Sequence, residues 1–187
     1  LETSGTERSH IRADWLAEGT DGLIALTGGP GGAFDQAIAA GQLDLAQARA
    51  ATLRGLFGDR LYVELQRHGL AEERATEPHL IDIAYAQSLP LVATNEPFFA
   101  APDDYESHDA LICIAEGRLI AETDRRQLTP EHYFKSRSEM TELFADLPEA
   151  IANTVEIAQR CSYRPRTLKP ILPRFTSRDA DEGVELR

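Results

Sequence analysis

The stretch Arg60-Leu-Tyr-Val-Glu-Leu-Gln-Arg67 alternates Leu61, Val63 and Leu65 with Tyr62, Glu64 and Gln66. Alternation with a period of two is typical of a β strand, because successive side chains point to opposite faces of the sheet. His68 and Gly69 follow the last residue and close the pattern. The stretch therefore predicts a strand over 60–67, with an imidazole at its carboxyl end.

Two more strands are predicted around this one. Residues 22–27 form a short apolar run that ends in the glycine-rich turn 28–32, and residues 91–95 form another apolar run. Apolar residues at helical spacing predict helices over 33–40, 43–57, 78–88, 103–116, 138–147 and 148–160. Strands and helices thus alternate along the chain.

This alternation favours an α/β fold with parallel strands and flanking helices, the last of them in a helical C-terminal part. The predicted strands are nearly continuous apolar runs, as expected for parallel strands buried on both faces. Three strands are few for an independent sheet, and a (β/α) barrel needs about eight. The chain is therefore expected to be part of a larger barrel.

Composition points to an acidic protein of ordinary core content. The 187 residues are 42% hydrophobic and 27% charged, with a formal net charge of −12. Because phosphate backbones bind clustered Lys and Arg, this surface as a whole should repel DNA. The basic stretch 160–174 is interpreted as a solvated tail or linker rather than a nucleic-acid contact.

Cysteine usage and hydropathy favour a cytoplasmic protein without a membrane contact. Apolar runs fall far below the ~18 residues of a membrane span, and Leu1 begins no recognisable export signal. Cys113 and Cys161 lie far apart and form no CxxC motif. We expect both to be buried thiols of a reduced protein.

The predicted strand ends are the places for chemistry, because sites in parallel α/β folds form at the carboxyl ends of strands. His68 is a candidate metal ligand or base, although a lone histidine is more often structural. Glu96 is a single carboxylate without a nearby histidine in sequence. The turn 28–32 lacks the known phosphate-binding motifs and is interpreted as a sharp strand-to-helix turn.

Other polar residues have simpler interpretations. Asp104, Glu106, His108 and Asp109 fall near the start of a predicted helix, where acidic residues complement the helix dipole. They are interpreted as capping and solvated residues rather than a cation site. The remaining histidines, His10, His79 and His132, lie in polar surroundings and are expected at the surface.

Several segments resemble the polymerase and histidinol phosphatase (PHP) domain, and more narrowly its version in bacterial DNA polymerase III alpha subunits. The resemblance rests on residues 60–69, 89–95, 107–114, 134–140 and 142–161, together with 14–16 and 22–29. The stretch 142–161, which reads Glu-Leu-Phe-Ala-Asp-Leu-Pro-Glu-Ala-Ile-Ala-Asn-Thr-Val-Glu-Ile-Ala-Gln-Arg-Cys, is the most specific. The match runs in order from about residue 11 to residue 175.

The resemblance implies the second half of a distorted (β/α)7 barrel. The family's early His-x-His strand and early Asp are not in this sequence, so residues 1–175 would be the later part of the domain. Residues 176–187 would be a linker or the start of the polymerase palm. The palm carboxylates that bind magnesium for nucleotide addition would then lie beyond Arg187.

The resemblance also indicates a degenerate metal site. His68 matches a retained ligand position, but the family's late Asp-x-His pair is replaced by Glu96-Pro97-Phe98. Glu96 keeps a carboxylate on a longer arm, and Phe98 cannot bind a metal. We expect no resident cofactor in this segment, with a weakened zinc or manganese site at His68 and Glu96 left open.

These implications favour one function over another. The first is a structural and docking part of a replicative DNA polymerase, with no catalytic residues in this segment. The proofreading exonuclease subunit and the rest of the polymerase would be its partners, and DNA would bind elsewhere in the parent chain. The alternative is a metal-dependent phosphoesterase or 3′–5′ exonuclease. Half a barrel exposes sheet edges, so self-association is also expected.

Overall fold

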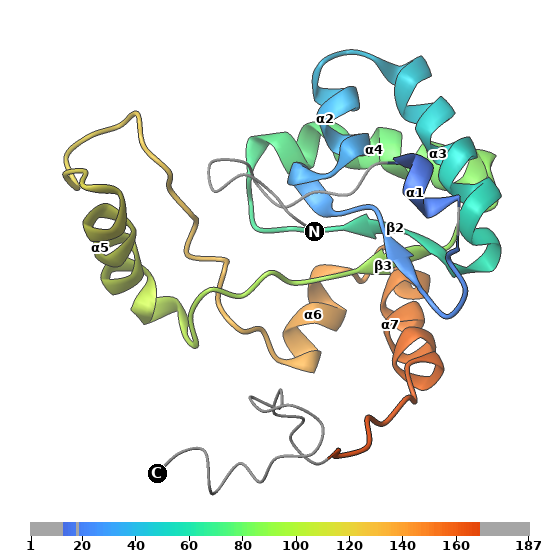
Figure 1. The fold of residues 1–187 in the computed structure, drawn as a ribbon. Coiled ribbons are helices and arrows are strands. Elements are labelled where there is room, and N and C mark those ends of the chain that lie inside the picture. The colour runs from blue at the N-terminus through green and yellow to red at the C-terminus, as the bar shows by residue number, and fades with distance from the viewer. Residues whose placement is uncertain (1–12, 18, 169–187) are drawn as a thin grey trace, which may run out of the picture.

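The computed structural model describes residues 13–17 and 19–168 (Figure 1). The predicted linker or palm segment, 176–187, lies outside these residues. In chain order the elements are α1 (Ala13–Leu16), β1 (Ala25–Leu26), η1 (Gly29–Gly31), α2 (Ala33–Ala39), α3 (Leu43–Phe57), η2 (Gly58–Arg60), β2 (Leu61–Leu65), α4 (Ala71–Ala86), β3 (Leu91–Ala93), η3 (Pro102–Asp104), α5 (Tyr105–Glu116), α6 (Arg137–Leu143) and α7 (Pro148–Arg160).

The strands form one parallel sheet in the order β1-β2-β3, which confirms the predicted α/β class. Ala25 pairs with Leu61, and Val63 pairs with Leu91. Helices α2, α3 and α4 lie on one side of the sheet, and α6 and α7 lie on the other (Figure 1). This arrangement covers both faces, as parallel sheets require, and is consistent with part of a PHP-type barrel.

The core is built around β2, whose five residues are all buried. Phe34 of α2, Leu61 and Val63 of β2, and Phe144 after α6 have no exposed surface. These side chains belong to one hydrophobic cluster that joins the two helical layers through the sheet. Because each large buried apolar side chain contributes about 1.5–3 kcal/mol, this cluster is the main source of stability.

The strands are shorter than the sequence predicts, and just beyond β1 a polar side chain takes over a hydrogen bond of the sheet. β1 spans two residues instead of 22–27. Beyond it, the backbone N–H of Glu64 bonds to the Thr27 hydroxyl oxygen, 2.9 Å away, instead of to a carbonyl of β1. The backbone hydrogen bonds between β1 and β2 therefore end here, and side-chain hydrogen bonds continue toward the site.

Two helices begin at residues other than those predicted. Helix α4 starts at Ala71 instead of residue 78 and keeps Pro78 inside it. The Glu73 carboxylate caps its first turn by accepting the backbone N–H of Leu70. Helix α6 starts after Ser136 rather than Ser138, because the Ser136 hydroxyl accepts the N–H of Glu139. The predicted bounds of α3 and α7 are confirmed.

Helix α5 stands apart from the sheet and the other helices (Figure 1). The predicted helix over 103–116 is divided between η3 and α5. Long connections lead out to α5 from β3 and back to α6, and an isolated β-bridge between Phe99 and Tyr133 pairs them. No helix within the described residues is long and apolar enough to cross a membrane.

Arg67 ties the two helical layers together just beyond β2. Its guanidinium donates two hydrogen bonds to Glu77 of α4, at 2.9 and 2.7 Å, and two to Asp146, at 2.7 and 2.8 Å. A further bond reaches the carbonyl of Leu143, and the guanidinium lies 4.5 Å from the centre of the Phe144 ring. These hydrogen bonds raise the pKa of Arg67, so the cation is always present.

Replacing Arg67 by Met should therefore destabilise the chain by about 2–3 kcal/mol. Methionine keeps the apolar stem but leaves Glu77 and the Leu143 carbonyl without their donor. Urea unfolding followed by circular dichroism measures the change. The matched variant Arg54→Met, at an exposed position of α3, should change stability by no more than about 0.5 kcal/mol. Equal effects at both positions would contradict this role for Arg67.

Candidate functional site

Polar side chains gather at the carboxyl ends of the strands. The Glu64 carboxylate of β2 accepts the backbone N–H of Gly28, the Thr94 hydroxyl and the Gln66 amide, at 2.9, 2.5 and 3.2 Å. Groups that follow all of β1, β2 and β3 thus converge on one carboxylate. Because Glu64 is almost fully buried, its hydrogen bonds hold the mouth of the sheet together.

The glycine turn after β1 is shaped by this cluster. Gly28 and Gly29 have φ angles of 94° and 56°, in the left-handed region that favours glycine. A Cβ atom on Gly32 would lie 2.1 Å from the Thr27 carbonyl oxygen, so the end of the turn needs glycine for space. The turn leads through η1 into α2, which confirms the interpretation as a sharp strand-to-helix turn.

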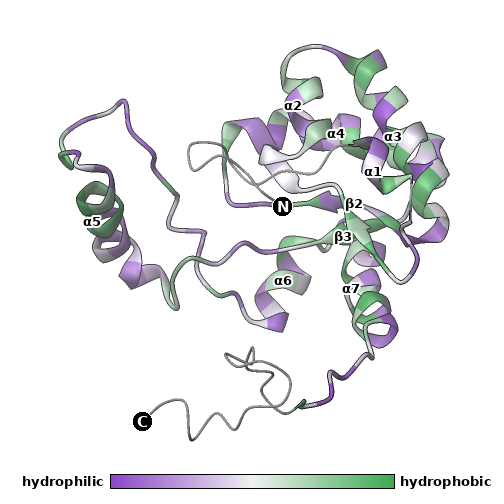
Figure 2. Cartoon of the chain, in the orientation of Figure 1, coloured by the Kyte–Doolittle hydropathy of each residue, from purple (hydrophilic) through white to green (hydrophobic). Residues whose placement is uncertain are grey.

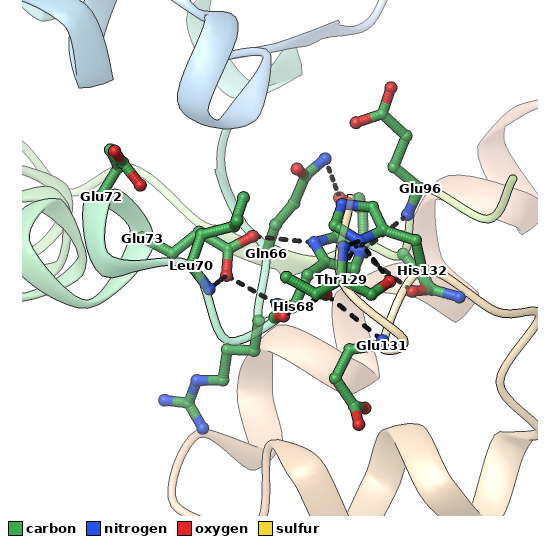
Figure 3. A network of polar contacts seen from close by, with 12 residues as sticks. Gln66, His68, Leu70, Glu72, Glu73, Glu96, Thr129, Glu131 and His132 are labelled. Atoms are coloured by element: carbon green, nitrogen blue, oxygen red, sulfur yellow. Dashed lines mark hydrogen bonds and ion pairs between the residues drawn. The ribbon is translucent and has the colours of Figure 1, made fainter. Parts of the chain in front are cut away.

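His68 lies at the centre of the cluster and is 1% exposed. Its Nδ1 lies 2.8 Å from one Glu73 oxygen, and its backbone N–H donates to the other at 2.6 Å (Figure 3). Burial raises the pKa of Glu73, but the hydrogen bonds from His68 and Leu70 outweigh it and leave the pKa below its usual value. Because an ionised carboxylate only accepts, Nδ1 must carry a hydrogen.

The other ring nitrogen of His68 is also enclosed by the protein. The backbone N–H of Glu96 donates to Nε2 at 3.3 Å, and the Asn95 oxygen lies 3.1 Å from it. Asn95 is held in this orientation because its amide nitrogen donates to the Tyr133 carbonyl at 2.8 Å. Nε2 therefore faces both a donor and an acceptor, so it has a partner whether or not it is protonated.

His132 was expected at the surface, and the structure corrects that expectation. It is 3% exposed, and its ring stacks on His68 with centroids 4.1 Å apart and planes 13° from parallel. Burial, followed by the neighbouring His68, lowers the pKa of His132. Thr129 fixes the same loop by donating its hydroxyl to the His68 carbonyl at 2.6 Å. His79 is exposed as expected, and His10 lies outside the described residues.

The second predicted ligand, Glu96, does not join His68 through its side chain. Glu96 is exposed, and its carboxylate points away from the imidazole (Figure 3). Phe98 packs near His132 and His108, with centroid distances of 5.9 and 5.8 Å, and Arg126 lies over its ring. Of these residues after β3, Glu96 therefore contributes its backbone N–H to the site, and Phe98 contributes an aromatic ring beside His132.

The described residues do not fit a metal centre. No three His, Cys, Asp or Glu side chains among residues 13–17 and 19–168 are grouped so that they could hold an ion. A metal on Nε2 of His68 would also have to displace the Glu96 N–H. The ligand roles of His68 and Glu96 remain predictions for the whole domain.

The polar residues near the start of α5 have the expected capping and solvated roles only in part. Asp104 caps the preceding turn by accepting the N–H of Ala101 at 3.0 Å. Asp109, expected to be a capping or solvated residue, is instead nearly buried and accepts two hydrogen bonds of 2.6 Å from Arg125. Of the two thiols, Cys113 is buried as expected, whereas Cys161 is exposed because the helix that precedes it has ended.

Comparison with known proteins shows what this chain is similar to. The chain is 49% identical to DNA polymerase III subunit alpha of Caulobacter vibrioides over 170 residues, which are 91% of this chain. It is 41% identical to the same subunit of Rickettsia bellii over 179 residues, and 37% identical to that of Escherichia coli K12 over 188 aligned residues. This chain is a homologue of bacterial DNA polymerase III alpha subunits.

The PHP domain model matches residues 2–68, and so includes β1, β2 and His68. The three alignments include 91%, 96% and 95% of this chain, but only 15–16% of the length of each relative. The homology thus joins the PHP-matching part to the residues after it, which carry Asn95, Glu96 and His132. The alignments alone do not extend the activity and partners of the longer relatives to this chain.

Asp35 of α2 is a further buried carboxyl group of the cluster. It is 3% exposed and accepts the Thr76 hydroxyl at 3.1 Å, whereas its Oδ2 has no hydrogen-bond partner among the described residues. Burial raises the pKa of Asp35 to about 6, and the charges of Glu64 and Glu73 add to the effect. At neutral pH the Asp35 carboxyl is therefore ionised although burial disfavours its charge, and this lowers the stability of the fold.

The difference in stability between Asp35→Asn and the unchanged chain should depend on pH. Since the folded-state pKa lies above the usual 3.8, the unchanged chain loses stability relative to the variant as pH rises from about 4 to above 6. The relative gain of the variant should reach about 2–3 kcal/mol. Urea unfolding at several pH values measures it, and a difference independent of pH would contradict the assignment.

Glu73→Gln should destabilise the chain by roughly 1–3 kcal/mol at pH 7. Its amide nitrogen cannot accept a hydrogen bond, so either the Nδ1–H of His68 or the backbone donors lose their partner. Glu72→Gln is the matched control, because Glu72 is the exposed neighbour on the same helix turn and points away from His68 (Figure 3). Urea midpoints that fall equally for both variants would contradict the role of Glu73.

Proposed function

We propose that this chain is a structural part of a DNA polymerase III alpha subunit in which the metal site at the strand ends has been replaced by a protein hydrogen-bond network. The observation that carries the proposal is the enclosure of His68. Glu73 holds one ring nitrogen, Glu96 and Asn95 surround the other, and His132 stacks on the ring. A buried, fully partnered imidazole serves stability rather than ligand exchange.

The parent chain would be a cytoplasmic, DNA-directed DNA polymerase, with magnesium bound by palm carboxylates outside these residues. This follows from the names of the relatives and from the resemblance. The segment itself would be inactive. Its acidic composition supports contact with proteins more than with DNA. By resemblance, the proofreading exonuclease subunit and the rest of the polymerase would be the partners.

The alternative function, a metal-dependent phosphoesterase or exonuclease, is favoured by one observation. The Glu73 carboxylate orients Nδ1 of His68, as carboxylates orient the histidines of metal sites. In a zinc or manganese enzyme, however, Nε2 would need to face the metal. Here it faces the Glu96 N–H, and the Glu96 carboxylate points elsewhere. The alternative therefore requires the residues after β3 to rearrange.

Metal analysis separates the two functions. A longer polypeptide that includes the upstream strands is purified without chelators and then titrated with zinc and manganese. We expect a folded protein with less than stoichiometric metal, and the same metal content per folded chain when His68 is replaced by Ala. Two or more tightly bound ions per chain, lost in the His68 variant together with phosphodiesterase activity, would overturn the proposal in favour of the enzyme.

A further inference from the structure

The outer surface of the α5 region exposes four large apolar side chains. Leu111 and Ile114 of α5 are 61% and 77% exposed, and Leu119 and Ile120 in the following turn are 70% and 62% exposed. Figure 2 shows hydrophobic residues gathered along α5, away from the rest of the fold. Contiguous exposed apolar residues of this kind mark interaction surfaces in soluble proteins.

The inner side of α5 is already packed, so the outer side is a preformed surface rather than half of an unfinished core. Ile112 and Cys113 are buried. The ion pair between Asp109 and Arg125 holds the returning segment against the helix, and the Tyr105 hydroxyl donates to the Leu128 carbonyl at 3.2 Å. The exposed apolar side chains therefore lie on a helix that is held in place from its other side.

The charge around this surface restricts its partner. Residues 103–126 contain seven Asp and Glu but three Arg. Ion pairs join Asp109 with Arg125 and Glu122 with Arg118. The carboxylates outside these pairs are those of Asp103, Asp104, Glu106, Glu116 and Asp124, and the remaining cation of the segment is Arg126. A complementary partner would present an apolar face bordered by Lys or Arg.

We infer that the face formed by Leu111, Ile114, Leu119 and Ile120 docks onto a basic-bordered apolar surface in the rest of the alpha-subunit polypeptide. The inference rests on the proposed function. This chain spans 15% of the length of its Caulobacter relative, so most of such a subunit lies outside it. Helix α5 reaches away from the sheet toward the side where nothing in the described residues covers it (Figure 1).

Hydrogen–deuterium exchange tests the inference directly. Exchange of residues 105–120 is compared between the 187-residue chain and the complete alpha subunit that contains it. We expect these amides to exchange about tenfold or more slowly in the complete subunit. Leu111→Ala with Ile114→Ala should return them to the rates of the short chain. The control, Leu43→Ala with Leu45→Ala at exposed positions of α3, should leave the protection unchanged.

Two results would overturn the inference. One is equal exchange of residues 105–120 in the short chain and the complete subunit. The other is protection that already appears in the short chain and grows with its concentration, which would assign the face to a second copy. Neither result bears on the proposed function, whose failure appears separately as stoichiometric metal on His68. Raising the salt concentration should weaken the protection if the acidic border contributes.

Discussion

The contact between Glu73 and His68 is the interaction on which the site depends. One carboxylate holds the His68 ring, accepts the His68 backbone N–H, and caps α4 by accepting the N–H of Leu70. The end of β2 and the start of α4 are thereby fixed to each other. Because all three donors are directed at two oxygens, losing the carboxylate would release the strand end, the helix and the imidazole together.

The same cluster explains how a chain that resembles metal-binding domains can keep their fold without their metal chemistry. Glu64 binds the turn after β1 and the residue after β3, which ties the three strand ends together without an ion. Figure 3 shows the His68 ring between protein groups on each side. The backbone N–H of Glu96 thus occupies the direction in which Nε2 of His68 would offer its lone pair to a metal, and hydrogen bonds keep the geometry of the strand ends.

Much of the fold could be predicted from the sequence, because strong periodicity decides element type. The alternation over 60–67 placed β2, and the spacing in 43–57 and 148–160 gave α3 and α7 with their bounds. The start of α4 was missed, because its cap comes from a glutamate inside the helix that accepts backbone donors before it. Periodicity of apolar residues carries no signal for such a contact.

The candidate site was predictable only in part. His68 was found because it follows a strand, whereas His132 was missed because it reaches His68 through a loop 64 positions later in the sequence. Its polar neighbours, Glu131 and Thr129, are as typical of an exposed turn as of a buried one. Only the contact between loop and strand end, made in three dimensions, buries the second imidazole.

Nitrogen NMR of the imidazole rings tests the central claim, that His68 is held by protein groups on both nitrogens. Long-range ¹⁵N–¹H spectra of the chain are recorded with and without excess zinc. The account predicts a hydrogen-bonded Nδ1–H on His68 and ¹⁵N shifts that zinc leaves unchanged. A stoichiometric zinc-dependent shift of the His68 Nε2, absent in a His68→Gln variant, would show that the network opens to a metal and would contradict the account.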